Sequence, residues 1–156
     1  MGELIPGAHL TVEFARPTLR HRPDGKPEAE EGCVSLSHCC DLTLAVRSPA
    51  DVGCDIESVI PRAAAVWDGL LGPDRHSLAQ LLAHEAHEHS DTATTRVWAA
   101  LEALKKAGAP VDTPLTLRPS VESGGWVILE AGAFAVATVA ACAGSPVAIA
   151  VAVRRP

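Results

Sequence analysis

The chain has 156 residues, enough for one domain with its own hydrophobic core. Apolar residues make up 47% and charged residues 21%, an ordinary globular composition, and the formal net charge of -6 argues against broad nucleic-acid binding. Aromatic residues are scarce, with three Trp, two Phe and no Tyr, so we expect an aliphatic core.

The cysteines and the apolar stretches indicate where the chain resides. Five cysteines are present, an odd number, and no secretory signal opens the sequence. We therefore expect reduced, structural thiols in a cytoplasmic protein. Cys39 and Cys40 are adjacent, and the spacing of the five matches no zinc pattern. The apolar stretch 133–153 is interrupted by Gly144-Ser145-Pro146, so neither half is long enough to span a bilayer as a helix.

The first third of the chain is predicted to be β-structure. Residues 8–15 carry β-branched and aromatic side chains in partial alternation, which predicts a strand. Residues 16–31 are rich in Pro, Gly and charge, which predicts a loop. Short strands are expected next, with turns at 38–41 and 47–51 between them: 33–37, 42–46 and 52–56.

Helical periodicity follows, and then strands return. Helices are predicted over 62–71, 74–87 and 94–107, the last ended by Gly108 and Pro110. Further strands are expected at 115–117, 126–130, 134–141 and 147–153, the final two forming a hairpin at Gly144–Pro146. Helices inserted between two groups of strands predict a single α+β domain over 1–156, with an irregular N-terminal segment over 1–31 and a core over 32–156.

Two acidic side chains share one face of a predicted strand. In Gly53-Cys54-Asp55-Ile56-Glu57, Asp55 and Glu57 are two residues apart and therefore point the same way. Adjacent like charges repel, and a hard divalent cation is one reason to keep them together. Magnesium takes few protein carboxylates and completes its shell with water and phosphate oxygens. A solvated strand end is the simpler interpretation of this motif alone.

The last predicted helix presents Trp98, Glu102 and Lys106 on roughly one face, at spacings of four residues. Glu102 could supply a third carboxylate to a metal, and Lys106 could hold a phosphate; an ordinary Glu-to-Lys helix pair is the alternative. Lys105 is expected to be a surface charge. The apolar stripe of this helix runs through Val97, Leu101 and Leu104.

A third motif precedes these two. Ser35-Leu36-Ser37-His38 ends a predicted strand, which would place the imidazole of His38 at the mouth of a loop. Upstream, Gly25-Lys26-Pro27 offers a lysine in a flexible loop, where it can reach anionic oxygens as a point charge. Each motif alone is more often structural than functional.

The order of these motifs resembles that of the 4′-phosphopantetheinyl transferases. The four motifs are G-K-P, S-L-S-H, G-C-D-I-E and R-V-W-A-A-L-E-A-L-K-K-A-G. The resemblance covers residues 25–108 and agrees in order and approximate separation. Its phrasing is closest to the C-terminal transferase domains of enediyne-type iterative polyketide synthases. It implies an antiparallel sheet packed against a long helix, with one half of the family's pseudodimer substantially complete. The missing half would come from upstream protein or from self-association.

The resemblance implies an activity in polyketide and antibiotic biosynthesis. The enzyme would move the 4′-phosphopantetheine group of coenzyme A onto a serine of an acyl carrier protein, with Mg²⁺ as cofactor. Asp55, Glu57 and Glu102 match the family's magnesium ligands. Glu102, or a water on the metal, would act as the base.

The same resemblance implies three basic residues that bind coenzyme A. Lys106 matches the helix lysine that contacts phosphate and assists catalysis. His38 matches the residue that holds the 3′-phosphate, and Lys26 matches the loop lysine on that side. One position departs from the family: Leu101 stands where a lysine is usual, which leaves the general base open.

Two alternatives remain open at this stage. The chain could be a catalytically degenerate member that binds coenzyme A or docks within a synthase, as Leu101 favours. The run His84-Glu85-Ala86-His87-Glu88-His89 could bind zinc or nickel, although its spacing is not that of H-E-x-x-H.

The acidic net charge bears on the expected partner. Carrier proteins are usually acidic and would be repelled at long range. Fusion to the same synthase, or a local patch from Arg16, Arg20 and Arg22, would offset that repulsion.

Overall fold

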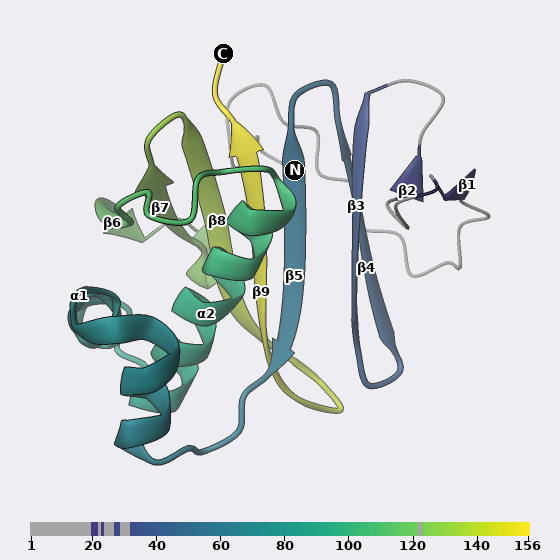
Figure 1. The fold of residues 1–156 in the computed structure, drawn as a ribbon. Helices are drawn as coiled ribbons and strands as arrows, with labels where there is room; N and C mark the ends of the chain where they lie inside the picture. The colour runs from purple at the N-terminus through teal and green to yellow at the C-terminus, as the bar shows by residue number, and fades with distance from the viewer. Residues whose placement is uncertain (1–19, 22, 24–26, 29–31, 122) are drawn as a thin grey trace.

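A computed structural model describes residues 20–21, 23, 27–28, 32–121 and 123–156, and confirms an α+β architecture (Figure 1). Its centre is an antiparallel five-stranded sheet in the order β5-β9-β8-β7-β6. The strands are β5 (Val52–Ser58), β6 (Thr116–Val121), β7 (Val127–Ala131), β8 (Phe134–Ala143) and β9 (Ser145–Arg154), with a short 3-10 turn at Ser123–Gly125.

Strand β6 is longer than the predicted 115–117 and continues through Pro119. Its register with β7 shifts between Leu117 and Val121. Proline lacks the N–H that an interior strand must donate, so it is confined to edge strands and irregular positions. Because β6 forms the outer edge of the sheet, the proline does not end it.

A separate hairpin of β3 (Cys33–Cys39) and β4 (Leu42–Ser48) stands beside β5 (Figure 1). Both strands run two residues beyond the predicted ends at 37 and 46. The turn is shorter than predicted because Cys40, with φ of 52°, reverses the chain within two residues. His38 therefore lies inside β3, paired with Thr43, and the expectation of a loop mouth there is wrong.

The N-terminal predictions are tested only in part. The strand expected at 8–15 lies outside the described residues. Within the loop expected at 16–31, β1 (Arg20–His21) pairs antiparallel with β2 (Pro27–Glu28), so that expectation is wrong at these four residues. Pro23, between the two strands, lies in a turn, where proline is a common residue.

Helix α1 (Ala64–Glu85) is interrupted at Gly72, whose φ of 72° and ψ of 170° are not helical. The interruption, followed by Pro73, confirms two helical segments where 62–71 and 74–87 were predicted. Helix α2 (Ser90–Lys106) begins four residues before the predicted Thr94. The side chain of His89 accepts a hydrogen bond from the Asp91 N–H and caps this earlier start.

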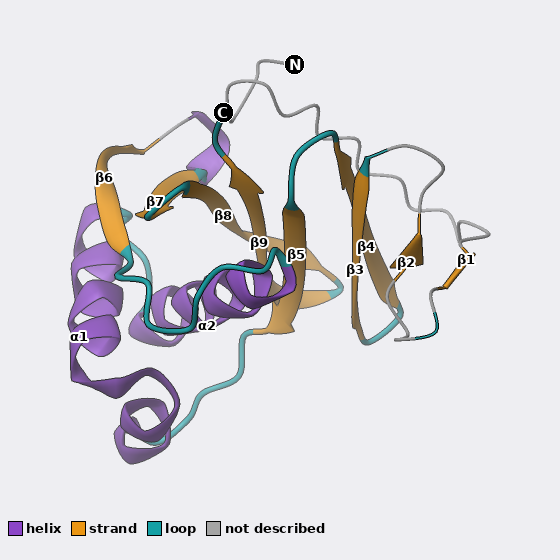
Figure 2. Cartoon of the chain, turned by 45° about the horizontal axis from the view of Figure 1, so that its top comes forward, coloured by secondary structure: helices purple, strands orange, loops and turns teal. Residues whose placement is uncertain are grey.

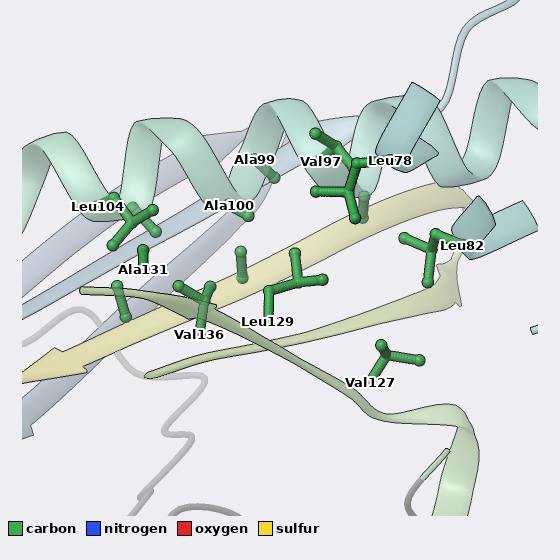
Figure 3. Close-up of a cluster of buried hydrophobic side chains, with 14 of the residues drawn as sticks. Leu78, Leu82, Val97, Ala99, Ala100, Leu104, Val127, Leu129, Ala131 and Val136 are labelled. Atoms are coloured by element: carbon green, nitrogen blue, oxygen red, sulfur yellow. The ribbon is translucent and has the colours of Figure 1, made fainter. Parts of the chain in front are cut away.

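Helix α2 crosses one face of the sheet over β5, β9 and β8, and α1 packs against α2 (Figure 2). The core between them is aliphatic, as expected (Figure 3). Alanines fill much of it, so helix and sheet backbones approach closely. The buried alanines of this core are Ala79, Ala93, Ala99, Ala100, Ala103, Ala107, Ala131, Ala148, Ala150 and Ala152.

A second apolar cluster covers the opposite face of the sheet. Leu44 and Val46 of the hairpin pack there with Cys54, Ile56 and Val151. The hairpin thus rests its apolar inner face on the sheet. No helix in the described part of the chain is long and apolar enough to cross a membrane.

Candidate functional site

Strand β5 points Gly53, Asp55 and Glu57 toward α2. A Cβ on Gly53 would lie 1.9 Å from the Ala103 carbonyl oxygen and 2.6 Å from the Ala107 nitrogen, so only glycine allows this approach. The C-terminal half of α2 therefore rests directly on the β5 backbone. That contact brings helix side chains within reach of the two acids, which share one face as the alternation predicts.

Asp55 is 4% exposed, an unusual position for a carboxylate. Its Oδ1 accepts hydrogen bonds from Lys106 Nζ at 2.7 Å and from Ser37 Oγ at 2.8 Å. Its Oδ2 is buried without a hydrogen-bond partner among the described residues. An unsatisfied buried acceptor is costly, and more so when it is charged. Oδ2 is therefore an open position for a donor or a cation.

Lys106 ties α2 to two strands. Besides Asp55, its ammonium donates to the Cys54 carbonyl at 3.1 Å and to the Leu36 carbonyl at 3.5 Å. All three of its protons are thereby used within the chain. The side chain remains 33% exposed, so solvent and ligands can reach it. The bond to Leu36 is the longest of the three and the one most easily exchanged for another acceptor.

Two serines fasten β3 to the edge of β5. Ser35 Oγ accepts from the Cys54 N–H at 3.0 Å, and Ser37 Oγ accepts from the Ile56 N–H at 3.3 Å. Hydroxyls thus take the place of backbone carbonyls, because β3 belongs to a separate sheet. The alternating Ser-x-Ser pattern was the available sequence signal. It was noted as part of a motif, but the role of Ser37 as a partner of Asp55 was missed.

Glu57 is half-buried and lies next to both other predicted metal ligands. Its pKa is raised, mainly by burial and then by the Asp55 charge, with a smaller contribution from Glu102. A hydrogen bond from Trp98 Nε1 at 3.3 Å and the positive charge of Arg62 partly offset this rise in pKa. Trp98 and Arg62 were not predicted as site residues, although both act on this carboxylate.

Glu102 joins the acidic pair through electrostatics rather than through contact. Its one described ion pair is with the exposed Lys105, at 3.4 Å. The described ranges contain no group of three His, Cys, Asp or Glu side chains close enough to enclose a metal. Asp55 Oδ2 and Glu57 nevertheless fit magnesium, which often takes one or two carboxylates and fills the remaining positions with phosphate oxygens and water.

The predicted coenzyme A contacts are less well connected to this site. His38 is exposed, and its Nδ1 lies 3.0 Å from Thr43 Oγ1. Because side chains alternate along a strand, His38 points to the face opposite Ser37 and Asp55. Lys26 lies outside the described residues, as do Arg16 and Arg22.

The histidines of the run 84–89, at the α1–α2 connection, each have a different local environment. His84 is exposed beside Glu85, His87 occupies the left-handed region with φ of 52°, and His89 caps α2. Glu88 is engaged by Arg96 at 2.8 Å. The imidazoles are therefore not gathered around one point in this arrangement.

No known protein family matches the chain, and no curated protein is significantly similar to it. The chemistry must therefore be argued from the site itself. Asp55, Glu57 and the partly exposed Lys106 lie where α2 crosses β5, and Glu102 acts on Glu57 through its charge alone. One Asp55 carboxylate oxygen has no hydrogen-bond partner among the described residues. Such a site can bind a hard cation together with an anionic, oxygen-rich ligand such as a phosphate.

Proposed function

We propose that the chain is a magnesium-dependent 4′-phosphopantetheinyl transferase domain that converts an apo acyl carrier protein to its holo form. The observation that carries this proposal is Asp55: it is buried, its Oδ1 is neutralised by Lys106, and its Oδ2 is open beside Glu57. A cation there would offset both the burial and the Asp55 charge, which raise the Glu57 pKa. The sequence motifs supply the substrate class, and the finer proposal of a transferase-like half of a pseudodimer rests on them too.

In this proposal Asp55 and Glu57 would hold Mg²⁺, with Glu102 as a further acid nearby, and the ion would supply charge neutralisation to the diphosphate of coenzyme A. The carrier serine Oγ forms a bond to the β-phosphorus, and the bond to adenosine 3′,5′-bisphosphate breaks. Glu102, a quarter exposed, accepts the serine proton.

Lys106 has a second part in the reaction. It stabilises phosphate oxygens by exchanging its long bond to the Leu36 carbonyl for a bond to the substrate. Its bonds to Asp55 and to the Cys54 carbonyl hold the ammonium in position meanwhile. Lys106 therefore both positions Asp55 and contacts the substrate.

The test is transfer to a panel of apo carrier proteins with coenzyme A and Mg²⁺, followed by intact-protein mass spectrometry. A gain of one phosphopantetheine group is expected. Asp55→Asn and Glu102→Gln keep the shape of each side chain and should each lower the rate by about a hundredfold or more. Lys105→Ala, at an exposed neighbour on the same helix, should be nearly silent. Full activity of Asp55→Asn in a folded protein would remove the proposed site.

A second function, coenzyme A binding without transfer, is favoured by Leu101. That side chain is partly buried against the main core, where the family usually has a lysine. Calorimetry with coenzyme A separates the two functions. Binding with no mass gain on any carrier protein would identify a docking or degenerate domain.

A further inference from the structure

Two thiols meet at the tip of the β3–β4 hairpin. Cys39 ends β3, and Cys40 begins the turn. The Sγ atom of Cys39 lies 3.0 Å from Ser58 Oγ, and the Sγ atom of Cys40 lies 3.7 Å from the same oxygen. The left-handed conformation of Cys40 turns its side chain to the side on which Cys39 lies. Adjacent residues of a regular strand would point in opposite directions.

Both thiols are free, and the pair can be reached from solvent. Cys40 is exposed and Cys39 is partly buried. Burial raises the pKa of the Cys39 thiol; the Ser58 hydrogen bond opposes this rise in pKa, and Cys40 and Glu57 add to it. Cys39 is therefore a protonated thiol at neutral pH, which disfavours reactions that need a thiolate nucleophile. Condensation of two thiols on one soft centre has no such requirement.

We propose that Cys39 and Cys40 form a vicinal dithiol site that captures thiophilic trivalent centres, with organic arsenic(III) oxides as the ligand class. Two S–H bonds and the arsenic–oxygen bond break, two As–S bonds form, and the oxygen leaves as water with both protons. Arsenic stays trivalent throughout, so no oxidant or reductant is needed. Soft thiolate ligands favour soft centres, and two sulfurs from one chain add the advantage of chelation.

The site lies next to the acidic cluster along the chain. Ser58 follows Glu57, so a group held by both sulfurs would sit at the end of β5 beside that carboxylate. Capture itself does not depend on the proposed transferase activity. Only the expected consequence, slower transfer by the loaded protein, rests on the proposed function.

The test uses the full chain, one equivalent of phenylarsine oxide and intact-protein mass spectrometry. One adduct is expected, which resists excess 2-mercaptoethanol and is removed by a dithiol. Cys39→Ser and Cys40→Ser should each weaken retention by about a hundredfold, because a single As–S bond exchanges with monothiols. Cys33→Ser and Cys142→Ser are matched controls, partly buried and exposed respectively, and should leave retention unchanged.

Two outcomes would overturn the dithiol site: an adduct that 2-mercaptoethanol strips from the unmodified chain, or full retention in Cys40→Ser. Cys40 is exposed, so that serine variant should fold normally, and circular dichroism checks it. An adduct with no transfer activity in any form of the protein would leave the site standing and contradict the proposed function instead. Normal transfer activity together with no stable adduct would contradict the dithiol site and leave the proposed function standing.

Discussion

Helix α2 pairs two cations with acids, Arg96 buried in its N-terminal half and Lys106 partly exposed at its C-terminal end. The two pairs differ in which polar atoms lack a hydrogen-bond partner. Arg96 is 1% exposed and donates to Glu88, to the Thr138 carbonyl at 2.7 Å and to the Gly125 carbonyl at 3.3 Å. Its Nε and Glu88 Oε1 are buried without partners among the described residues. One is a donor and the other an acceptor, so the polar atoms left over in this pair are complementary.

The Lys106 end leaves only an acceptor. Asp55 Oδ2 has no partner in the described structure, and the pKa of Glu57 is raised first by burial and then by the charges of Asp55 and Glu102. The first pair is thus closed and complementary, as expected of a structural anchor. The second leaves a single acceptor, which a donor or a cation from outside the chain would satisfy. Burial of an ion pair alone does not indicate a function, whereas an unpaired carboxylate oxygen next to a second acid marks a candidate site.

The largest change in unfolding free energy is expected when each cation is removed in turn, in Arg96→Met and in Lys106→Met. Arg96→Met leaves Glu88 buried and unpaired and should cost about 3–5 kcal/mol of unfolding free energy. Lys106→Met should also destabilise the chain, because Asp55 loses its partner. Millimolar Mg²⁺ should recover much of that second loss by binding the acids.

Urea denaturation with and without Mg²⁺ measures both variants. Arg96→Met should gain no more from Mg²⁺ than the unmodified chain gains. Adding Glu88→Gln to Arg96→Met removes the unpaired charge and should recover part of the loss. An equal increase of unfolding free energy by Mg²⁺ in Arg96→Met and Lys106→Met would contradict the proposed difference between the two ion pairs.

A smaller effect is expected from Gly53→Ala, which disturbs only the Lys106 end of α2. The added methyl meets the backbone of Ala103 and Ala107, which cannot rotate away. We expect a loss of about 1–3 kcal/mol and reduced Mg²⁺ stabilisation, since α2 moves off β5. Gly69→Ala is the control: its methyl meets nothing within 4 Å in α1 and should stabilise by about 0.5–1 kcal/mol. A normal Mg²⁺ response in Gly53→Ala would show that the close approach is unimportant to the site.

The smallest effect is a pH dependence from Glu57. Its folded pKa lies above the usual 4.5, so the folded chain holds this proton more tightly than the unfolded chain does. Stability therefore falls as pH rises from about 4.5 through the folded pKa. Glu57→Gln removes that fall and keeps an acceptor for Trp98. Urea midpoints from about pH 4 to about pH 7, without divalent cations, should show the variant gaining on the unmodified chain; parallel curves would contradict the shift.

The sequence alone predicted the structure correctly where one regular pattern determines which way a side chain points or where an element ends. Strand alternation placed Asp55 and Glu57 on one face, and helical spacing placed Trp98 and Lys106 on the side that meets them. The core strands β7, β8 and β9 were predicted to within a few residues because their apolar runs are continuous. Gly72 and Pro73 marked the break between helices for a simple conformational reason.

The remaining features depend on contacts between distant segments. No local pattern reveals that Ser37 donates a hydrogen bond to Asp55, or that Lys106 donates hydrogen bonds to two backbone carbonyls. The position of His38 followed from a turn at Cys40, which is not a usual residue for positive φ. Whether His38 and Lys106 bind coenzyme A stays a prediction, as do the magnesium ligands.

The serine attachment of β3 has a consequence for motion. Strands in one sheet separate only when their ladder breaks, but the polar contacts between β3 and β5 come mainly from side chains, and Leu44 and Val46 add apolar packing. Loss of these contacts would free the hairpin while all five central strands stay paired. Such a hinge would uncover Asp55 to incoming solutes, and fast amide exchange at Cys54 and Ile56, against slow exchange along β9, would reveal it.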